Sequence, residues 1–240
     1  MLHYYLAVLF LIPWTALGVS FAIVSKLLNP GGQIAHQVGR VWSWGILKIS
    51  GMNLKVKGLE NIKKEKQYIF LANHTSAYDI PAVYWVLPNK LGMLAKKQLR
   101  YIPFFGWAMW AAGHFFVDRH DHRKAIAVMD QVAKLMAKNR SHSLVIFPEG
   151  TRTLDGQLQR FKKGAFILSL DTGIPVVPVI INGGFKAKSK RSHAIVPTTL
   201  DISILPPVDP GAYSRDTRQQ FLDDVHQTFE DNYIPPSAAE

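Results

Sequence analysis

Short apolar runs that end in polar residues, and that alternate with helical segments, constrain the fold of this chain more than any other feature. Residues 68–72, Tyr-Ile-Phe-Leu-Ala, are continuously apolar, and Asn73 and His74 follow at once. Runs of this kind, separated by helices, are typical of buried strands in a largely parallel sheet. The predicted strands are 54–57, 68–72, 91–95, 114–117, 144–147 and 176–181, and the predicted helices are 123–138, 166–170 and 217–229. We therefore expect an α/β fold, with a mostly parallel or mixed sheet flanked by helices.

The first 50 residues have a different character and predict a two-helix hairpin. No charged side chain occurs from Tyr4 to Ser25. A helix of this length spans about 33 Å, close to the ~30 Å thickness of a hydrocarbon core, although Pro13 and Gly18 interrupt it. It could span a membrane or lie in one leaflet. After Gly31-Gly32, residues 34–49 place apolar side chains at helical spacing.

The second helix is amphipathic, which is typical of a segment at a membrane interface. Its expected polar side carries His36, Gln37, Arg40, Ser43 and Lys48. We expect residues 1–50 to form a membrane-anchoring helical hairpin and residues 51–240 to form the α/β domain. The alternative is a pair of core helices in a soluble bundle. Basic residues follow the long apolar run and none precedes it, which predicts that the rest of the chain is cytoplasmic.

Composition limits the chemistry that the chain can perform. There is no cysteine among its 240 residues. Disulfides, thiolate nucleophiles and cysteine-based zinc sites are therefore excluded. The formal net charge of +11 predicts attraction to nucleic acid, to an anionic membrane surface or to phosphorylated substrates, and charge alone does not choose among these.

A histidine and an aspartate lie at the end of the second predicted strand. His74 is followed five residues later by Asp79, at the start of a helical segment that contains Pro81. On one continuous helix the two side chains would lie about 140° apart, so a contact requires His74 to be in a loop that turns back toward Asp79. A carboxylate on one imidazole nitrogen makes the other nitrogen a better base. The alternative is that Asp79 only caps its helix.

Two further strand ends carry residues suited to an anion. Asp118 and Arg119 directly follow the predicted strand 114–117. The guanidinium of Arg119 could hold a phosphate or a carboxylate with two parallel hydrogen bonds. A surface ion pair is the alternative for these two residues.

The run 147–152, Phe-Pro-Glu-Gly-Thr-Arg, follows another apolar strand. Gly150 permits a tight turn, Thr151 offers a hydroxyl and Arg152 a second guanidinium. We expect Glu149 to pair with Arg152 or Arg119, or to shape the loop. Lys162 or its neighbour Lys163 could add charge to the same pocket, and a solvated position is the alternative for each.

These stretches resemble, in this order, the motifs of the glycerolipid acyltransferase family, specifically its 1-acyl-sn-glycerol-3-phosphate (lysophosphatidate) acyltransferases. His74 and Asp79 match the motif His-x-x-x-x-Asp, residues 113–119 match Gly-x-x-Phe-(Ile/Val)-x-Arg, residues 147–152 match Phe-Pro-Glu-Gly-(Thr/Ser)-Arg, and residues 177–179 resemble the last motif. The resemblance covers roughly residues 50–205, and the motifs are specific in combination.

The resemblance implies transfer of a fatty acyl chain from acyl-CoA or an acyl carrier protein to the sn-2 hydroxyl of lysophosphatidate. His74 would be the general base and Asp79 would hold its imidazole. Residues expected to bind the glycerol phosphate are Arg119, Glu149, Gly150, Thr151, Arg152 and Lys162. Asn73 or a loop N–H is the candidate for the oxyanion donor, and residues 104–112 could line an acyl groove or form a core helix. No cofactor, metal or nucleic acid is expected, and the expected location is the cytoplasmic face of a membrane, a bacterial inner membrane being favoured.

Three other functions are alternatives to this one. A related acyltransferase could act on another lysophospholipid or on glycerol-3-phosphate. A basic nucleic-acid-binding protein is disfavoured by the absence of base-reading modules and by the apolar N-terminus. A non-catalytic lipid-binding protein on the same fold would keep the arginines but would not need His74.

Overall fold

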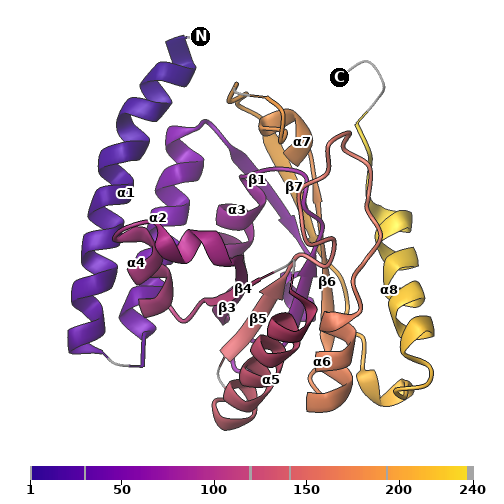
Figure 1. Ribbon diagram of the computed structural model, residues 1–240. Coiled ribbons are helices and arrows are strands. Elements are labelled where there is room, and N and C mark those ends of the chain that lie inside the picture. The colour runs from indigo at the N-terminus through magenta and orange to yellow at the C-terminus, as the bar shows by residue number, and fades with distance from the viewer. Residues whose placement is uncertain (1, 30, 119–120, 141, 193, 237–240) are drawn as a thin grey trace.

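A seven-stranded sheet forms the centre of the computed structural model, which describes residues 2–29, 31–118, 121–140, 142–192 and 194–236. The strands are β1 (Asn53–Lys57), β2 (Ile69–Ala72), β3 (Lys90–Lys96), β4 (Phe115–Val117), β5 (His142–Ile146), β6 (Val176–Asn182) and β7 (Thr199–Ile204). Their order across the sheet is β1-β7-β6-β2-β5-β3-β4, and every pair is parallel except β6 with β7. The expected mostly parallel, mixed α/β sheet is confirmed (Figure 1).

The central strands separate two hydrophobic cores, one on each face of the sheet. Strand β2 is buried along its whole length. Because side chains alternate along a strand, Phe70 and Ala72 belong to one core and Ile69 and Leu71 to the other. Edge strand β1 instead alternates between exposed and half-buried positions. The continuous apolar runs of the sequence therefore correspond to strands covered on both faces.

Helices cover both faces of the sheet (Figure 1). On one side lie α1 (Leu2–Leu28), α2 (Gln33–Ile49), α3 (Asp79–Val86) and α4 (Phe105–Ala111), and on the other lie α5 (His122–Lys138), α6 (Gly164–Thr172) and α8 (Arg218–Asn232). A short helix, α7 (Gly184–Ala187), follows β6, and three 3-10 turns, η1 (Leu59–Asn61), η2 (Lys97–Tyr101) and η3 (Pro210–Ala212), complete the described elements. Parallel strands require such crossovers, and in these crossovers the helices bury their apolar faces.

The two N-terminal helices pack on each other, and α2 also packs on α3. Two residues of the face of α2 that was expected to be polar are buried: His36 is 2% exposed and Ser43 is 0% exposed, whereas Gln37 and Lys48 are exposed. His36 Nδ1 lies 2.8 Å from the hydroxyl of Tyr84 in α3, so the polar side chain finds a partner there. Val41, an apolar residue of the same helix, is 51% exposed. The hydrogen bond to Tyr84 in α3, which the periodicity could not reveal, accounts for the burial of His36.

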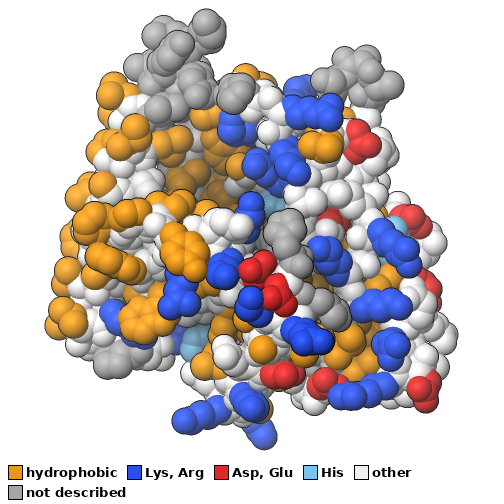
Figure 2. All heavy atoms as spheres, in the orientation of Figure 1, with side chains coloured by type: hydrophobic (Ala, Val, Ile, Leu, Met, Phe, Trp, Pro, Cys, Tyr) orange, Lys and Arg blue, Asp and Glu red, His pale blue; other side chains and the backbone are white. Residues whose placement is uncertain are grey.

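Helix α1 exposes a long row of apolar side chains. Its segment Leu9–Leu28 is, among the residues that the structure describes, the one helix long and apolar enough to cross a membrane. Leu27 is 83% exposed and Phe21 is 64% exposed. Figure 2 shows the corresponding side of the molecule covered by apolar side chains, whereas Lys and Arg gather over the rest of this face.

Strand β7 was not predicted, although a signal for it was present. Its sequence, Thr-Leu-Asp-Ile-Ser-Ile, alternates polar and apolar residues, and its burial alternates in the same way. This period of two is typical of a strand with one covered face. With β1, strand β7 extends the sheet by two strands antiparallel to the others.

Candidate active site

The loop after β2 brings His74 and Asp79 together. His74 Nδ1 lies 3.0 Å from Asp79 Oδ2, and the same oxygen accepts hydrogen bonds of 2.7 Å from the backbone N–H groups of Thr75 and Ser76. Asp79 is fully buried and is the first residue of α3. The chain therefore turns back between the two side chains, as their spacing required, and Asp79 also lies where a helix N-terminus stabilises negative charge.

This arrangement assigns the two ring nitrogens of His74. With Asp79 present as a carboxylate, Nδ1 carries the proton and Nε2 has the lone pair that can accept one. The ring stacks on Phe147, with centroids 4.2 Å apart and planes 27° apart. The His74 side chain keeps 11% of its surface exposed. A held imidazole with one basic nitrogen and access to a ligand is suited to general base chemistry.

Glu149 joins the loop after β5 to the loop after β2. Its Oε1 accepts from the backbone N–H of His74 at 2.6 Å, and its Oε2 accepts from Gln159 Nε2 at 3.0 Å. Burial raises the pKa of Glu149 to about 7, against hydrogen bonds from His74 and Gln159 that lower it. Among the described residues Glu149 makes these bonds and no ion pair with Arg152, which agrees with the expectation that it shapes the loop; Arg119 lies outside the described residues. Gln159 was not predicted, and its spacing from Glu149 gave no signal.

The residues after Glu149 form a positively charged turn. Gly150 has a φ of 76°, and a Cβ at this position would lie 2.7 Å from Lys162 Nζ. Thr151 Oγ1 accepts a hydrogen bond of 3.0 Å from Lys190 Nζ. Arg152 is half-buried. The structure thus places Gly150, Thr151, Arg152 and Lys162 in one region, as the sequence suggested.

Two predicted features are placed differently or not at all. Arg119 lies outside the described residues, as does His120, and the preceding residue, Asp118, accepts from Lys97 Nζ at 3.4 Å. Asn73 is fully buried, and both ends of its amide bind the backbone of Ile181 in β6, at 2.9 and 2.7 Å. Its side chain connects β2 to β6. Because both ends of the amide are already bonded, Asn73 is no longer a candidate for stabilising an oxyanion.

The loop after β6 completes the site and was not predicted. A Cβ on Gly184 would lie 2.7 Å from Asp79 Oδ1 and 2.6 Å from Thr75 Oγ1. Ser76 Oγ donates a hydrogen bond of 3.1 Å to the carbonyl oxygen of Lys188. Because β6 is parallel to β2, its end lies at the same edge of the sheet as His74. The Asn-Gly-Gly sequence directly after the apolar run was the signal for this turn.

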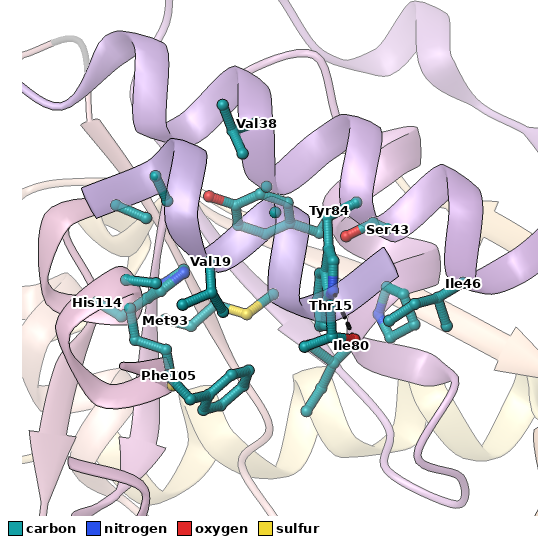
Figure 3. A pocket seen from close by; sticks show the side chains of 18 of the residues that line it. Thr15, Val19, Val38, Ser43, Ile46, Ile80, Tyr84, Met93, Phe105 and His114 are labelled. Carbon is teal, nitrogen blue, oxygen red and sulfur yellow. Dashed lines mark hydrogen bonds between the residues drawn. The ribbon is translucent and has the colours of Figure 1, made fainter. Parts of the chain in front are cut away.

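An apolar cavity of about 420 Å³ lies between the N-terminal helices and the α/β sheet (Figure 3). Thr15 and Val19 of α1, Val38 and Ile46 of α2, Tyr84 of α3 and Phe105 of α4 surround it. Ala77 and Tyr78, which lie in the His74–Asp79 loop, and Lys188 also line it. The cavity therefore extends from the two N-terminal helices to the residues beside the His74–Asp79 pair.

Comparison with known proteins agrees with this geometry. The profile of the acyltransferase family matches residues 53–182. The chain is 31% identical over 257 residues to a 1-acyl-sn-glycerol-3-phosphate acyltransferase of Saccharomyces cerevisiae, covering 100% of this chain and 84% of the relative. It is 30% identical over 227 residues to the protein of the same name from Limnanthes douglasii, covering 91% and 78%.

A solved structure shares the fold. The 1-acyl-sn-glycerophosphate acyltransferase PlsC of Thermotoga maritima superposes with a TM-score of 0.78 at 23% identity, covering 96% of this chain and 91% of that one. The family profile spans more than half of the chain, and the two relatives are similar over most of their length. The chain therefore belongs to the acyltransferase family.

Proposed function

We propose that this acyltransferase moves a fatty acyl chain from acyl-CoA or an acyl carrier protein to the sn-2 hydroxyl of lysophosphatidate, giving phosphatidate. The observation that carries the proposal is the 3.0 Å contact between His74 Nδ1 and Asp79 Oδ2, beside a turn rich in cations. The names of the two relatives support lysophosphatidate as the acceptor. The absence of cysteine agrees with direct acyl transfer without a thiol nucleophile on the enzyme.

In the proposed reaction, His74 acts as the general base. Its Nε2 takes the proton of the acceptor hydroxyl while the hydroxyl oxygen attacks the thioester carbonyl carbon. The tetrahedral intermediate then breaks its carbon–sulfur bond, and the proton on Nε2 passes to the leaving thiolate. Two backbone N–H groups hold the buried carboxylate of Asp79 in place beside the imidazole. The negative charge of this carboxylate stabilises the imidazolium that exists between these two steps. The products are the ester and a free thiol.

The cationic turn after β5 would bind the glycerol phosphate. Arg152 and Lys162 supply charge, Thr151 a hydroxyl, and Gly150 a close approach of the backbone. Glu149 contributes by holding this turn against the backbone of His74. Arg119 is proposed for the same role from its motif. Fixing the phosphate places the acceptor hydroxyl at His74, which lowers the entropic part of the barrier.

The apolar cavity would receive an acyl chain. Its lining comes from α1, α2, α3 and α4, and the only charged side chain among the described residues that line it is Lys188. Phe105, Ala108 and Ala112 belong to the segment that was considered for this role. A methylene chain buried there gains about 0.8 kcal/mol for each CH₂ removed from water.

The exposed apolar side chains support a membrane location. Helix α1 and the exposed Trp107 and Trp110 of α4 would enter the bilayer, with the catalytic residues on its cytoplasmic face. Residues 1–50 would be the anchoring unit and residues 51–240 the catalytic unit, and α2 joins them through its contacts with α3. This location brings a lipid acceptor to the site without its leaving the membrane.

A panel of acceptors and donors with the full chain in detergent tests the proposal. We expect lysophosphatidate to exceed glycerol-3-phosphate and other lysophospholipids in kcat/KM, and His74→Ala to lower kcat by about 10²–10⁴-fold. Asp79→Asn should lower kcat while KM changes little. The control is Gln227→Ala, which removes an exposed polar side chain from α8 and should leave kcat close to that of the wild type.

The outcomes separate the rival functions. A higher rate with another acceptor would reassign the substrate within the acyltransferases. Activity of His74→Ala close to that of the wild type would end the base assignment. Binding of lysophosphatidate without turnover by any donor would favour the non-catalytic lipid-binding protein.

A further inference from the structure

The segment that follows β6 carries a group of basic residues against the candidate active site. It contains Lys186, Lys188, Lys190 and Arg191. Its backbone is bound to the loop of the proposed base, because Ser76 Oγ donates to the carbonyl oxygen of Lys188 at 3.1 Å. Helix α7, directly before Lys188, begins at Gly184, which lies against Asp79 and Thr75. The position of Lys188 is therefore tied to that of the His74–Asp79 pair.

Lys188 is one of the residues that line the apolar cavity. Among the described residues that line this cavity it is the one with a full charge, since burial lowers the pKa of His114 to about 4. Lys188 Nζ donates a hydrogen bond of 3.1 Å to the carbonyl oxygen of Ser192. A cation at the wall of an otherwise apolar cavity suits a ligand that has an anionic head and an apolar tail.

Cations of two different loops meet at this point. Burial lowers the pKa of Lys188, and the positive charge of Arg152 lowers it further. Lys190 Nζ donates to Thr151 Oγ1, which directly precedes Arg152. Like charges at short range repel each other, and an anion placed between them turns the repulsion into attraction. Figure 2 shows Lys and Arg side chains along the edge of a hollow with apolar walls.

We propose that Lys188 and Lys190 bind the phosphate of the acceptor together with Arg152, as a second arm of the acceptor site contributed by the loop after β6. This inference rests on the proposed function and adds to it two residues outside the four motifs. The three cations can each donate charge-assisted hydrogen bonds to a phosphate, whose oxygens accept from several directions. Because Lys188 also lines the apolar cavity, the same contacts would align the acceptor along it.

Steady-state kinetics with the full chain in detergent test the inference. Lysophosphatidate and acyl-CoA are varied in turn for the wild type, Lys188→Ala, Lys188→Arg and Lys190→Ala. Loss of one charge-assisted hydrogen bond, worth about 1.5–3 kcal/mol, raises the KM for lysophosphatidate roughly 10–100-fold. We expect that increase for Lys188→Ala, a smaller one for the exposed Lys190→Ala, and a partial return with Lys188→Arg. The KM for acyl-CoA should change less than about twofold.

A matched control separates this effect from a general change in charge. Lys134→Ala removes the same charge from an exposed position of α5, on the other face of the sheet, and should leave both KM values unchanged. The thermal unfolding midpoint of each variant identifies any loss of folded protein. With 1-acylglycerol, which lacks the phosphate, Lys188→Ala and the wild type should have equal rates.

Two results would overturn the inference while the proposed function stands. One is a wild-type enzyme that acylates lysophosphatidate and a Lys188→Ala variant with an unchanged KM for it. The other is an increase confined to the KM for acyl-CoA, which would assign these lysines to the donor. If the wild type does not acylate lysophosphatidate at all, the proposed function fails first.

Discussion

The carboxylate of Glu149 accepts a hydrogen bond of 2.6 Å from the backbone N–H of His74. This bond joins the loops at the ends of two neighbouring strands, β5 and β2. The backbone N–H of Thr153 adds a second link, since it donates to the carbonyl oxygen of His74 at 3.0 Å. The loop with the proposed base and the loop with the proposed phosphate site therefore form one unit, and this unit sets the geometry between them.

The buried carboxyl of Glu149 predicts a dependence of stability on pH. Its pKa is about 7 in the folded chain, above the ordinary value of 4.5 that it regains on unfolding. Between pH 4.5 and pH 7 the Glu149 carboxyl keeps its proton in the folded chain and releases it in the unfolded chain. Its contribution to the free energy of unfolding is therefore fully present below pH 4.5 and is lost as pH rises through 7. We expect the free energy of unfolding of the wild type to fall by up to ~3 kcal/mol across this pH range, at ~1.4 kcal/mol per pKa unit. Glu149→Gln should lack this fall.

Thermal unfolding of the wild type and of Glu149→Gln from about pH 4.5 to about pH 7.5 checks this dependence. The wild type should lose stability relative to Glu149→Gln as pH rises through this range. A difference between the two proteins that is the same at every pH would contradict the raised pKa. Gln159→Ala, which leaves the carboxyl in place, should retain a pH dependence of the same sign.

The close packing around Gly184 predicts that a single added methyl group will lower the catalytic rate. A Cβ there would lie 2.7 Å from Asp79 Oδ1 and 2.6 Å from Thr75 Oγ1, distances that require one of the two loops to move. We expect Gly184→Ala to lower kcat at least about 10-fold, because a displaced Asp79 no longer holds the imidazole of His74 in place. Gly164→Ala is the matched control, since its Cβ would have Met129 Cε at 3.9 Å as its nearest contact. A Gly184→Ala enzyme with wild-type kcat would show that the loops can separate freely.

The hydrogen bonds that Arg40 makes from α2 to α3 predict that the N-terminal helices contribute to the stability of the whole chain. Its guanidinium donates to the carbonyl oxygens of Trp85 at 2.9 Å and Leu87 at 3.2 Å, at the C-terminal end of α3. We expect Arg40→Ala to lower the free energy of unfolding by about 1–3 kcal/mol, because these carbonyls lose charged donors. Lys48→Ala, at an exposed position of the same helix, should have little effect. Equal unfolding midpoints for both variants would mean that the two bonds from Arg40 to α3 do not stabilise the fold.

The cavity predicts a dependence of activity on chain length. Ala108 lines it and is 8% exposed, so Ala108→Leu fills part of its volume. Long acyl chains should then lose kcat/KM more than short chains, with donors and acceptors of graded length measured separately. The substrate whose preference shifts is the one whose chain occupies the cavity. Ala127→Leu, at an exposed position of α5, is the control, and an equal loss at every length would argue against an acyl chain in this cavity.

Much of the fold could be predicted because its buried strands are continuous apolar runs. Strand β5, predicted as 144–147, spans His142–Ile146, and strand β6, predicted as 176–181, spans Val176–Asn182. Strand β7 was missed even though it alternates with a period of two. For α2, periodicity located the helix but did not reveal that His36 is buried, because this depends on a hydrogen bond to Tyr84 in α3.

By itself, the sequence determined that His74, Glu149 and the residues around them follow buried strands, and that a contact between His74 and Asp79 requires a turn back of the chain. Local spacing is enough for this, since these residues are neighbours in sequence or end strands of one parallel sheet. Only the tertiary structure decided that Asn73 binds β6, that Glu149 holds the backbone of His74, and that Lys188 lies at the cavity. These contacts join residues that lie far apart in the chain, and no local pattern encodes a hydrogen bond across such a separation.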